Sequence, residues 1–338
     1  MAPATFAQAL PQSTRSEVLE WTFPKPFNHL VLTGRSRAGW HTSFIIPQLD
    51  LVLDVGYVVN KVRPNQVFIT HGHTDHSGRV PVFISRTRCP DIYCPAELKS
   101  AMDAYAMYSR VMNEGGNVGP CKPEGGEDQG TGNNNDAEGE DDDDDGRGPP
   151  GPKWLDTHVS FGMKDGDVVP LRKIKSDIVA TAFNCDHTVP CIGYVFSQIN
   201  NKLKPEYTGL KGPELKKLRQ SGAEITAPVK ANIFAFCGDT TTKPLEAEPQ
   251  WLKDGIPVVI VECSFLYPEH IAQARKTKHV YWGDIEPIIR KWPKTTFVLM
   301  HFSLRYTDKE IRDFFYSMED APANMVIWSD GCRDDDIN

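Results

Sequence analysis

The chain has 338 residues, of which 40% are hydrophobic and 24% are charged. These values are typical of globular proteins and exclude a mainly disordered, collagen-like or coiled-coil chain. The formal net charge is −8 at pH 7, but residues 114–145 hold 12 acidic side chains against one basic one, so the rest of the chain is close to +3. The net charge therefore does not exclude a polyanionic partner.

Eight cysteines are spread along the chain without a Cys-x-x-Cys pair. Such sparse usage is typical of reduced, buried thiols in an intracellular protein. The first 30 residues lack a continuous apolar signal core, and no run approaches the roughly 18 apolar residues that span a bilayer. We therefore predict no membrane segment, treat residues 1–30 as an N-terminal extension, and expect a location in the cytoplasm or nucleus, with an organelle left open.

Six short aliphatic or β-branched runs are apolar enough to be buried strands. They lie at 51–55, 66–70, 177–183, 232–236, 257–261 and 296–300. Each run contains or leads into a side chain with acid–base or metal-binding chemistry, in order Asp54, His71, His187, Asp239, Glu262 and His301. Because α/β proteins form their ligand sites at strand ends, the pattern predicts an α/β fold with one shared site along a sheet edge.

Residues 113–153 are rich in Gly, Pro, Asn and acidic side chains and hold few apolar ones. Such a composition does not offset the entropy of ordering, so it predicts a disordered surface insertion. We interpret the insertion as a solvated loop, with the binding of a basic partner as the alternative.

A second charged segment has the opposite sign. Residues 201–230 hold seven basic and three acidic side chains. Within them, GPELKKLRQSG predicts a short helix that ends at Gly222. The helix region presents Lys211, Lys216, Lys217 and Arg219. These side chains suit phosphate contacts, although a solvated helix end that matches the helix dipole is the alternative.

The densest group of chemically active side chains follows the run at 66–70. The sequence His71-Gly72-His73-Thr74-Asp75-His76 places three imidazoles and one carboxylate within six positions. All four are good zinc ligands. Because successive side chains alternate in direction, His71 and His73 can reach one metal, while Asp75 and His76, further round the turn, reach a neighbouring one.

Four ligands in one loop do not complete two metal sites, so the other strand ends must supply the rest. His187, Asp239 and His301 are the candidates. Each of them alone could equally be a hydrogen-bonded core residue. A shared carboxylate suits the bridging of two cations about 3.5 to 4 Å apart, and we assign this role to Asp239.

Several motifs together carry a family resemblance. LVLDVG, ITHGHTDHSG, CDHTVPCIGY, FCGDTT and LMHFSLRY resemble the five ordered motifs of the metallo-β-lactamase superfamily. HFSLRY, VECSFL and the segment KPEYTGLKGPELKKLRQSGAEIT further resemble short plant-type members of the tRNase Z (ribonuclease Z) family. The resemblance extends from Gly34 to Met318 and is interrupted by the acidic insertion. It implies an αββα metallo-β-lactamase sandwich over residues 31–338, with a basic substrate-binding arm at 199–230.

The resemblance also implies roles for individual residues. His71, His73 and His187 would bind the first zinc ion; Asp75, His76 and His301 would bind the second; and Asp239 would bridge them. Manganese or magnesium could replace zinc. Asp54 would order the ligand loop without binding metal, and Asp75 would also be catalytic.

The general acid departs from the commonest family pattern. Many members carry His-Glu-Ala-Thr where this chain has Val261-Glu262-Cys263-Ser264, so that histidine is absent. Short plant-type members have a similar Glu and a downstream His, which Glu262 and His279 match. A carboxylate that orients an imidazole is sound acid catalysis. A buried structural Glu262 and a solvated His279 are the alternatives.

We further expect Arg305 to hold the scissile or a neighbouring phosphate with its planar guanidinium, and Ser303 to add a hydroxyl donor. A structural salt bridge is the alternative for Arg305. The leading hypothesis is a homodimeric, zinc-dependent endoribonuclease that removes the 3′ trailer from precursor tRNA. It would leave a 3′-hydroxyl on the tRNA and a 5′-phosphate on the trailer. The alternatives are a thioester or lactone hydrolase similar to glyoxalase II and a catalytically degenerate RNA-binding member.

Overall fold

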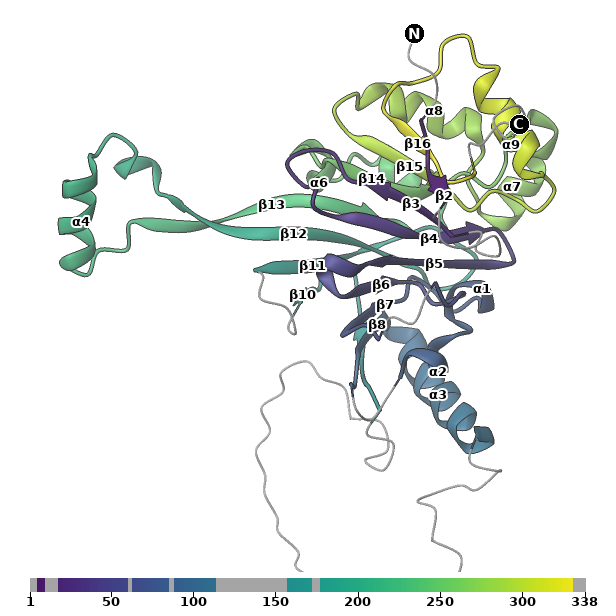
Figure 1. Ribbon diagram of the computed structural model, residues 1–338, viewed down its shortest axis with the longest axis horizontal. Helices are drawn as coiled ribbons and strands as arrows, with labels where there is room; N and C mark the ends of the chain where they lie inside the picture. The colour runs from purple at the N-terminus through teal and green to yellow at the C-terminus, as the bar shows by residue number, and fades with distance from the viewer. Residues whose placement is uncertain are drawn as a thin grey trace, which may run out of the picture.

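The computed structural model of the chain describes residues 5–9, 18–59, 63–84, 88–113, 157–171 and 177–330. Their strands form two eight-stranded sheets that pack face to face (Figure 1). The first sheet contains, in spatial order, β2 (Gln8–Ala9), β3 (Leu19–Thr22), β4 (Val31–Arg37), β5 (His41–Ile46), β6 (Leu51–Leu53), β7 (Gln66–Phe68), β8 (Asp91–Pro95) and β9 (Val159–Met163). The second contains β1 (Thr5–Phe6), β16 (Met325–Ile327), β15 (Thr296–Met300), β14 (Val258–Glu262), β13 (Thr226–Phe236), β12 (Ile192–Leu203), β11 (Ile178–Asn184) and β10 (Val168–Pro170).

Helices connect these strands. In chain order they are α1 (Thr74–Ser77), α2 (Val80–Phe83), α3 (Lys99–Asn113), α4 (Gly212–Gln220), α5 (Lys243–Glu246), α6 (Gln250–Lys253), α7 (Ile271–Thr277), α8 (Trp282–Lys291) and α9 (Asp308–Tyr316). None of the described helices combines the length and apolarity that crossing a bilayer requires. The predicted acidic insertion lies outside the described residues, apart from Asn113 at the end of α3.

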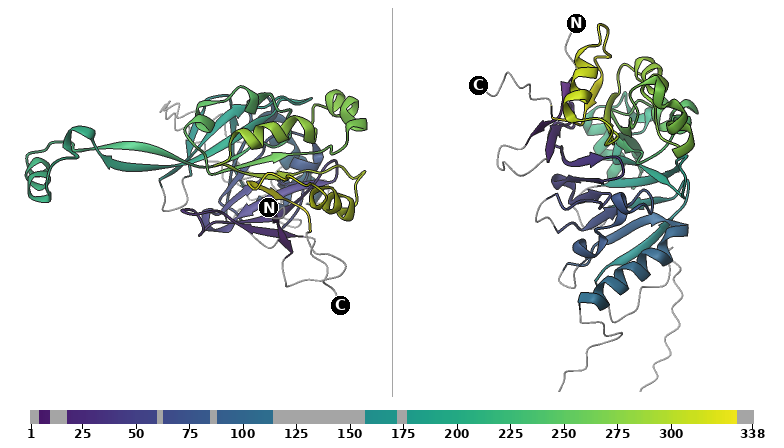
Figure 2. Two further views of the ribbon diagram at one scale, coloured as in Figure 1. Left: turned by 90° about the horizontal axis from the view of Figure 1, so that it is seen from above. Right: turned by 90° about the vertical axis from the view of Figure 1, so that its right-hand side faces the viewer.

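Three apolar cores explain the layering. The central core lies between the sheets and includes Phe44 and Phe234. A second core packs the other face of the second sheet against α8 and α9 through Ile285 and Phe315. A third packs the first sheet against α2 and α3 through Met102. Three cores between four layers make the αββα sandwich that the resemblance implied (Figure 2).

Burial on both faces explains why the predicted strands are continuously apolar. In β14, Val258 and Ile260 enter the central core, while Val259 and Val261 enter the core beneath the helices. Successive side chains of a strand point to opposite faces, so both faces need apolar side chains here. All six predicted strands are present. The run at 296–300 has the predicted bounds, and the other five differ by one to six residues; the largest difference is in β13, which begins six residues earlier.

The N-terminal segment differs from the prediction. Within residues 1–30, which we treated as an extension, β3 pairs antiparallel with β4 and β1 pairs parallel with β16. Leu19 and Phe23 are buried in the central core. This segment therefore belongs to the sandwich, and its strands of two to four residues are too short for a sequence pattern to reveal.

The predicted active strand ends belong to two sheets rather than to one. Asp54 and His71 follow β6 and β7 of the first sheet. The four others lie at the ends of strands of the second sheet: His187 after β11, Asp239 after β13, Glu262 at the end of β14 and His301 after β15. The site thus lies where the ends of both sheets meet, and a single sheet edge was the wrong expectation.

A long hairpin leaves the sandwich. Strands β12 and β13 pair antiparallel from Tyr194↔Phe236 out to Leu203↔Thr226, and helix α4 lies in the connection between them. Both views across its length show the hairpin projecting from the body with α4 at its tip (Figures 1 and 2). The helix that the sequence predicted is present and ends before Gly222, whose φ of +84° suits glycine.

Candidate metal centre

The His71–His76 segment leads from β7 into α1 at the edge where the ends of the two sheets meet. His71 and His73 lie in the turn after β7, and Asp75 and His76 lie within α1. Gly56 makes room for this turn, because a Cβ on Gly56 would lie 1.6 Å from the Asp75 carbonyl oxygen. The four side chains therefore leave a short segment in different directions.

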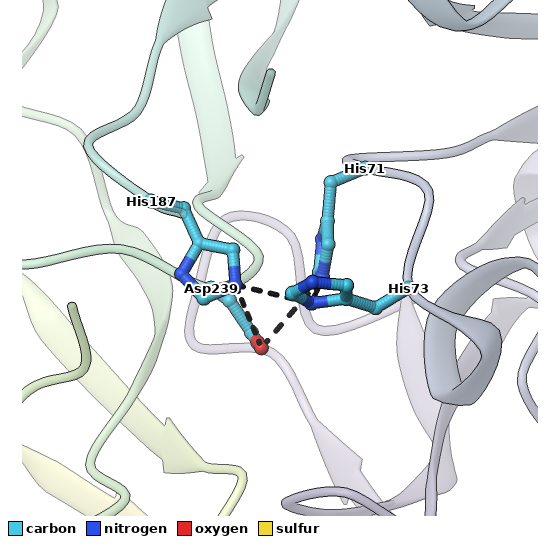
Figure 3. A group of neighbouring side chains, drawn as sticks. All are labelled: His71, His73, His187 and Asp239. Atoms are coloured by element: carbon cyan, nitrogen blue, oxygen red, sulfur yellow. Dashed lines mark hydrogen bonds and ion pairs between the residues drawn. The ribbon is translucent and has the colours of Figure 1, made fainter. Parts of the chain in front are cut away.

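The first cluster consists of His71, His73, His187 and Asp239 (Figure 3). His73 Nδ1 lies 3.1 Å from His71 Nε2 and 3.2 Å from His187 Nε2. Asp239 Oδ2 lies 3.8 Å from His71 Nε2 and 4.0 Å from His187 Nε2. Three imidazole nitrogens from two sheets thus converge on one point, beside a carboxylate.

The second cluster consists of Asp75, His76 and His301. The two Nε2 atoms of His76 and His301 lie 3.2 Å apart. Asp75 Oδ2 lies 3.7 Å from His76 Nε2 and 3.6 Å from His301 Nε2. This cluster joins α1 to the end of β15.

Asp239 lies between the two clusters. In addition to its contacts with the first, its Oδ1 is 3.3 Å from His76 Nε2 and its Oδ2 is 3.3 Å from His301 Nε2. The side chain is buried, and Oδ1 has no hydrogen-bond partner. A buried carboxylate oxygen without a hydrogen bond is costly unless a cation compensates it.

The donor set fits divalent cations. In tetrahedral coordination at about 2.0 to 2.1 Å, ligand nitrogens lie about 3.3 to 3.4 Å apart, close to the 3.1 and 3.2 Å separations in the first cluster. Burial lowers the pKa of His71, His73 and His187, which favours the neutral imidazole that binds metal. Burial acts in the same direction on His76, but Asp239 and Asp54 outweigh it and raise its pKa, so a metal ion held by His76 would have to displace a proton.

An outer set of oxygens orients four of these imidazoles through the nitrogen that faces away from the cluster. Asp54 Oδ2 lies 2.7 Å from His76 Nδ1, and Asp54 also accepts from the Thr70 N–H. The other three contacts are Thr70 Oγ1 to His71 Nδ1 (3.0 Å), the Lys278 carbonyl to His187 Nδ1 (3.2 Å) and Ser264 Oγ to His301 Nδ1 (3.0 Å). Such contacts set the tautomer and the ring orientation of a ligand.

The backbone at two of these residues is strained. Asp54 has φ +54° and His301 has φ +62°, a region that non-glycine residues rarely adopt. Gly238, before Asp239, has φ +60°, and a Cβ there would lie 2.6 Å from Thr70. Strain and close approach concentrate where the strand ends converge, as is typical of functional sites.

Glu262 and His279 form a pair beside the clusters. His279 Nδ1 lies 2.8 Å from Glu262 Oε1, and the carboxylate also accepts from Ser264 Oγ and the Thr240 and Val280 N–H groups. Burial works to lower the pKa of His279, but Glu262 outweighs it and raises the pKa to about 9. His279 Nδ1 is 3.9 Å from Asp239 Oδ2, and His279 also groups with Asp239 and His301. The pair is therefore adjacent to the candidate metal ligands.

The predicted phosphate contacts fall into two places. Arg305 is exposed in the turn after β15. Ser303 is 9% exposed, and its hydroxyl accepts from the Arg305 N–H at 3.3 Å, so Ser303 shapes the turn that presents Arg305. Lys211, Lys216, Lys217 and Arg219 are exposed on or beside α4 at the tip of the arm.

Sequence reasoning missed the residues that support the candidate ligands from outside. Thr70 and Ser264 each contact a candidate ligand histidine and a carboxylate of the site. Thr70 directly precedes His71, and Ser264 lies two positions after Glu262, which is the only signal that the sequence offers. Arg37 is a further omission, since it donates to the carbonyls of Ser303 and Tyr306 and pairs with Asp308 at 2.6 Å.

Several known proteins are similar to this chain. A family model for the metallo-β-lactamase superfamily matches residues 59–167. The tRNase Z TRZ1 of Arabidopsis thaliana is 27% identical over 289 residues, which cover 83% of this chain and 88% of that protein. The chain is therefore similar to this superfamily over residues 59–167 and to a plant tRNase Z over most of its length.

Two further proteins are similar to this chain. The nuclear ribonuclease Z of Triticum aestivum is 29% identical over 202 residues, which cover 58% of this chain and 91% of that protein. The crystal structure of the short form of human tRNase Z aligns with a TM-score of 0.43 at 13% identity, covering 98% of this chain and 95% of that chain.

Proposed function

We propose that the protein is a metal-dependent endoribonuclease that removes the 3′ trailer from precursor tRNA. The observation that carries this proposal is the pair of ligand clusters that share the buried carboxylate of Asp239. Two adjacent cations suit the hydrolysis of phosphodiesters, because they can stabilise both the attacking and the leaving oxygen. The relatives named tRNase Z and ribonuclease Z support RNA as the substrate.

We assign two zinc ions to each subunit, with manganese or magnesium as possible replacements. His71, His73 and His187 would hold one ion, Asp75, His76 and His301 the other, and Asp239 would contact both. When bound, the ions would activate water and neutralise charge on the scissile phosphate. Asp54, Thr70 and Ser264 would keep the ligand imidazoles in place.

The chain's own acid–base group is the Glu262–His279 pair. A pKa of about 9 keeps His279 protonated at neutral pH, and its side chain is 17% exposed, so a substrate can reach it. We assign His279 to protonate the leaving 3′-oxygen, with Glu262 holding the imidazole in position. The products would be tRNA with a 3′-hydroxyl and a trailer with a 5′-phosphate.

Substrate binding is assigned to two surfaces. Arg305 would contact a phosphate near the scissile bond, because its turn follows His301 directly. The basic side chains of α4 would grip tRNA away from the site, where phosphate contacts position a nucleic acid without reading its sequence.

We also propose a homodimer. Helix α3 exposes Tyr105, Tyr108 and Met112 by 42%, 59% and 75%. Their spacing of three and four residues puts them on one face of the helix. A monomer rarely leaves so many large apolar side chains together in water, so this face supports contact with a second copy.

Mapping the cleavage site on a precursor tRNA tests the proposal. We expect cleavage at the trailer junction with the stated end groups. A parallel incubation with a glutathione thioester tests the thioester hydrolase alternative, for which the arm would have no use. A chain that binds tRNA without cleaving it, and that holds less than one metal ion, would instead be the degenerate RNA-binding member.

A further inference from the structure

The turn between β4 and β5 is attached to both halves of the metal centre. The Gly39 N–H donates to Asp75 Oδ2 at 2.9 Å, which fixes the turn to α1. On the other side, the Ala38 N–H donates to the Phe302 carbonyl at 3.1 Å, and Ala38 pairs with Ser303. Trp40, which follows Gly39, therefore has a defined place at the rim of the site.

Trp40 is unusually exposed for its size. The residue is 53% exposed, although burying an indole is favourable and tryptophan is mostly buried in globular proteins. Its neighbours hold it in place: Arg35 Cζ lies 4.6 Å from the centre of the indole ring, and the His41 ring centroid lies 4.6 Å away at 57°. His41 in turn contacts the ring of Tyr57 at 5.1 Å.

Leu304 extends this apolar rim. It is 52% exposed and follows Ser303, the residue that pairs with Ala38. Exposed apolar side chains scattered singly need no explanation. Here, however, Trp40 and Leu304 lie on either side of the backbone pairing between Ala38 and Ser303, beside the candidate metal ligands. Trp40 also stacks against the Arg35 guanidinium.

We propose that Trp40, braced by Arg35, is a stacking platform for a nucleobase next to the scissile phosphate. The inference rests on the proposed function and specifies how the RNA is positioned. An aromatic ring stacks on any base, and a guanidinium adds cation–π attraction and draws in phosphate. Because the turn is hydrogen-bonded to Asp75, a base held on Trp40 brings the adjoining phosphate to the candidate metal ligands.

The test is a double-mutant cycle in which one change is a substitution of Trp40 and the other is the removal of bases from the substrate. The full chain, loaded with metal, is compared with Trp40→Ala, Trp40→Phe and Trp40→Leu. The substrate is a short tRNA acceptor stem with a 3′ trailer, made with normal bases or with abasic nucleotides on both sides of the scissile bond. Val168→Ala serves as the control, since Val168 is 55% exposed on β10 and has no part in the site.

With normal bases, Trp40→Ala and Trp40→Leu should weaken binding about 5- to 150-fold, and Trp40→Phe should restore most of the loss. With the abasic substrate, the variants and the unmodified chain should bind equally. A loss that is the same on both substrates overturns the proposal, as does wild-type affinity in both variants. Trp40→Leu keeps a large apolar side chain without an aromatic ring. It therefore tests stacking even if Trp40→Ala loses metal.

A spectroscopic signal identifies the base. 2-Aminopurine, placed on the 5′ or the 3′ side of the scissile bond, should be quenched on mixing with the unmodified chain and with Trp40→Phe, but not with Trp40→Leu. Quenching on either side supports the platform and names the base; quenching on neither side overturns it. If the unmodified chain neither binds nor cleaves this RNA, the proposed function itself fails. If the chain cleaves the RNA but the effect of the Trp40 substitutions does not depend on the base, only the platform proposal fails.

Discussion

Replacing His279 with alanine should impair cleavage in a way that depends on the leaving group. The imidazole lies 2.8 Å from Glu262 and has a pKa of about 9, so it carries a proton at neutral pH. A positioned general acid contributes about 10²- to 10⁴-fold to the rate, which is roughly 3 to 5 kcal/mol of barrier. We therefore expect kcat on precursor tRNA to fall by this factor in His279→Ala.

The assay compares two phosphodiesters. Precursor tRNA loses an alkoxide that needs a proton, whereas bis(4-nitrophenyl) phosphate loses a phenolate that is a stable anion. His279→Ala should therefore retain most of its activity on the second substrate, with unchanged metal content. Equal losses on both substrates would refute the reasoning. A simultaneous loss of metal would instead identify His279 as a ligand, as its grouping with Asp239 and His301 also allows.

Glu262→Gln supplies the matched variant, because it keeps the shape of the side chain and removes its charge. Without the carboxylate, the pKa of His279 should return toward or below the ordinary value of about 6.5. The protonated fraction would then fall from about nine tenths to a few per cent at pH 8, so the rate deficit should be about 30-fold there and smaller at pH 6. A deficit that is independent of pH would show that Glu262 acts only as a structural residue.

Four further outcomes follow from the site and the arm. Asp75→Ala should abolish cleavage, reduce bound metal and leave tRNA affinity nearly unchanged by filter binding; cleavage at the wild-type rate would contradict its assignment. Gly56→Ala should lower the free energy of unfolding by about 1 to 3 kcal/mol or more, seen in denaturant titration, because the new Cβ meets the Asp75 carbonyl. Lys216→Ala with Lys217→Ala should raise KM and reduce the salt slope of binding by about two, with kcat unchanged. Deletion of 114–145 should leave metal content intact and tRNA affinity unchanged or stronger; weaker binding would give the insertion a role in recognition.

Local sequence patterns were sufficient for much of the fold. A strand such as 257–261 is buried on both faces, so its apolar run is visible without any knowledge of its neighbours. The helix at 212–220 was equally predictable from the sequence, since Gly222 follows a run of good helix formers. Strand β12 was missed entirely. The outer half of β13 was also missed, because it leaves the sandwich and carries polar side chains. The short strand β3 was missed because four residues do not establish a period.

The candidate site divides in the same way. His71, His73, Asp75 and His76 form a cluster that the sequence shows directly, because they lie within six positions. That His187, Asp239 and His301 join them depended on resemblance and on the expectation that strand ends converge. The contact between Glu262 and His279 spans 17 positions, and the support of His301 by Ser264 spans 37. No local pattern encodes such pairs.

By itself, the sequence determined which residues can carry the chemistry, because residue type sets the donor atoms and the apolar runs set the strands that present them. Only the tertiary structure decided how those atoms meet. It placed Asp239 between two clusters, left its Oδ1 without a hydrogen bond, and joined the turn that carries Trp40 to Asp75 through the Gly39 N–H. The physical reason is that these distances arise where two sheets pack against each other, and packing joins residues that are far apart along the chain.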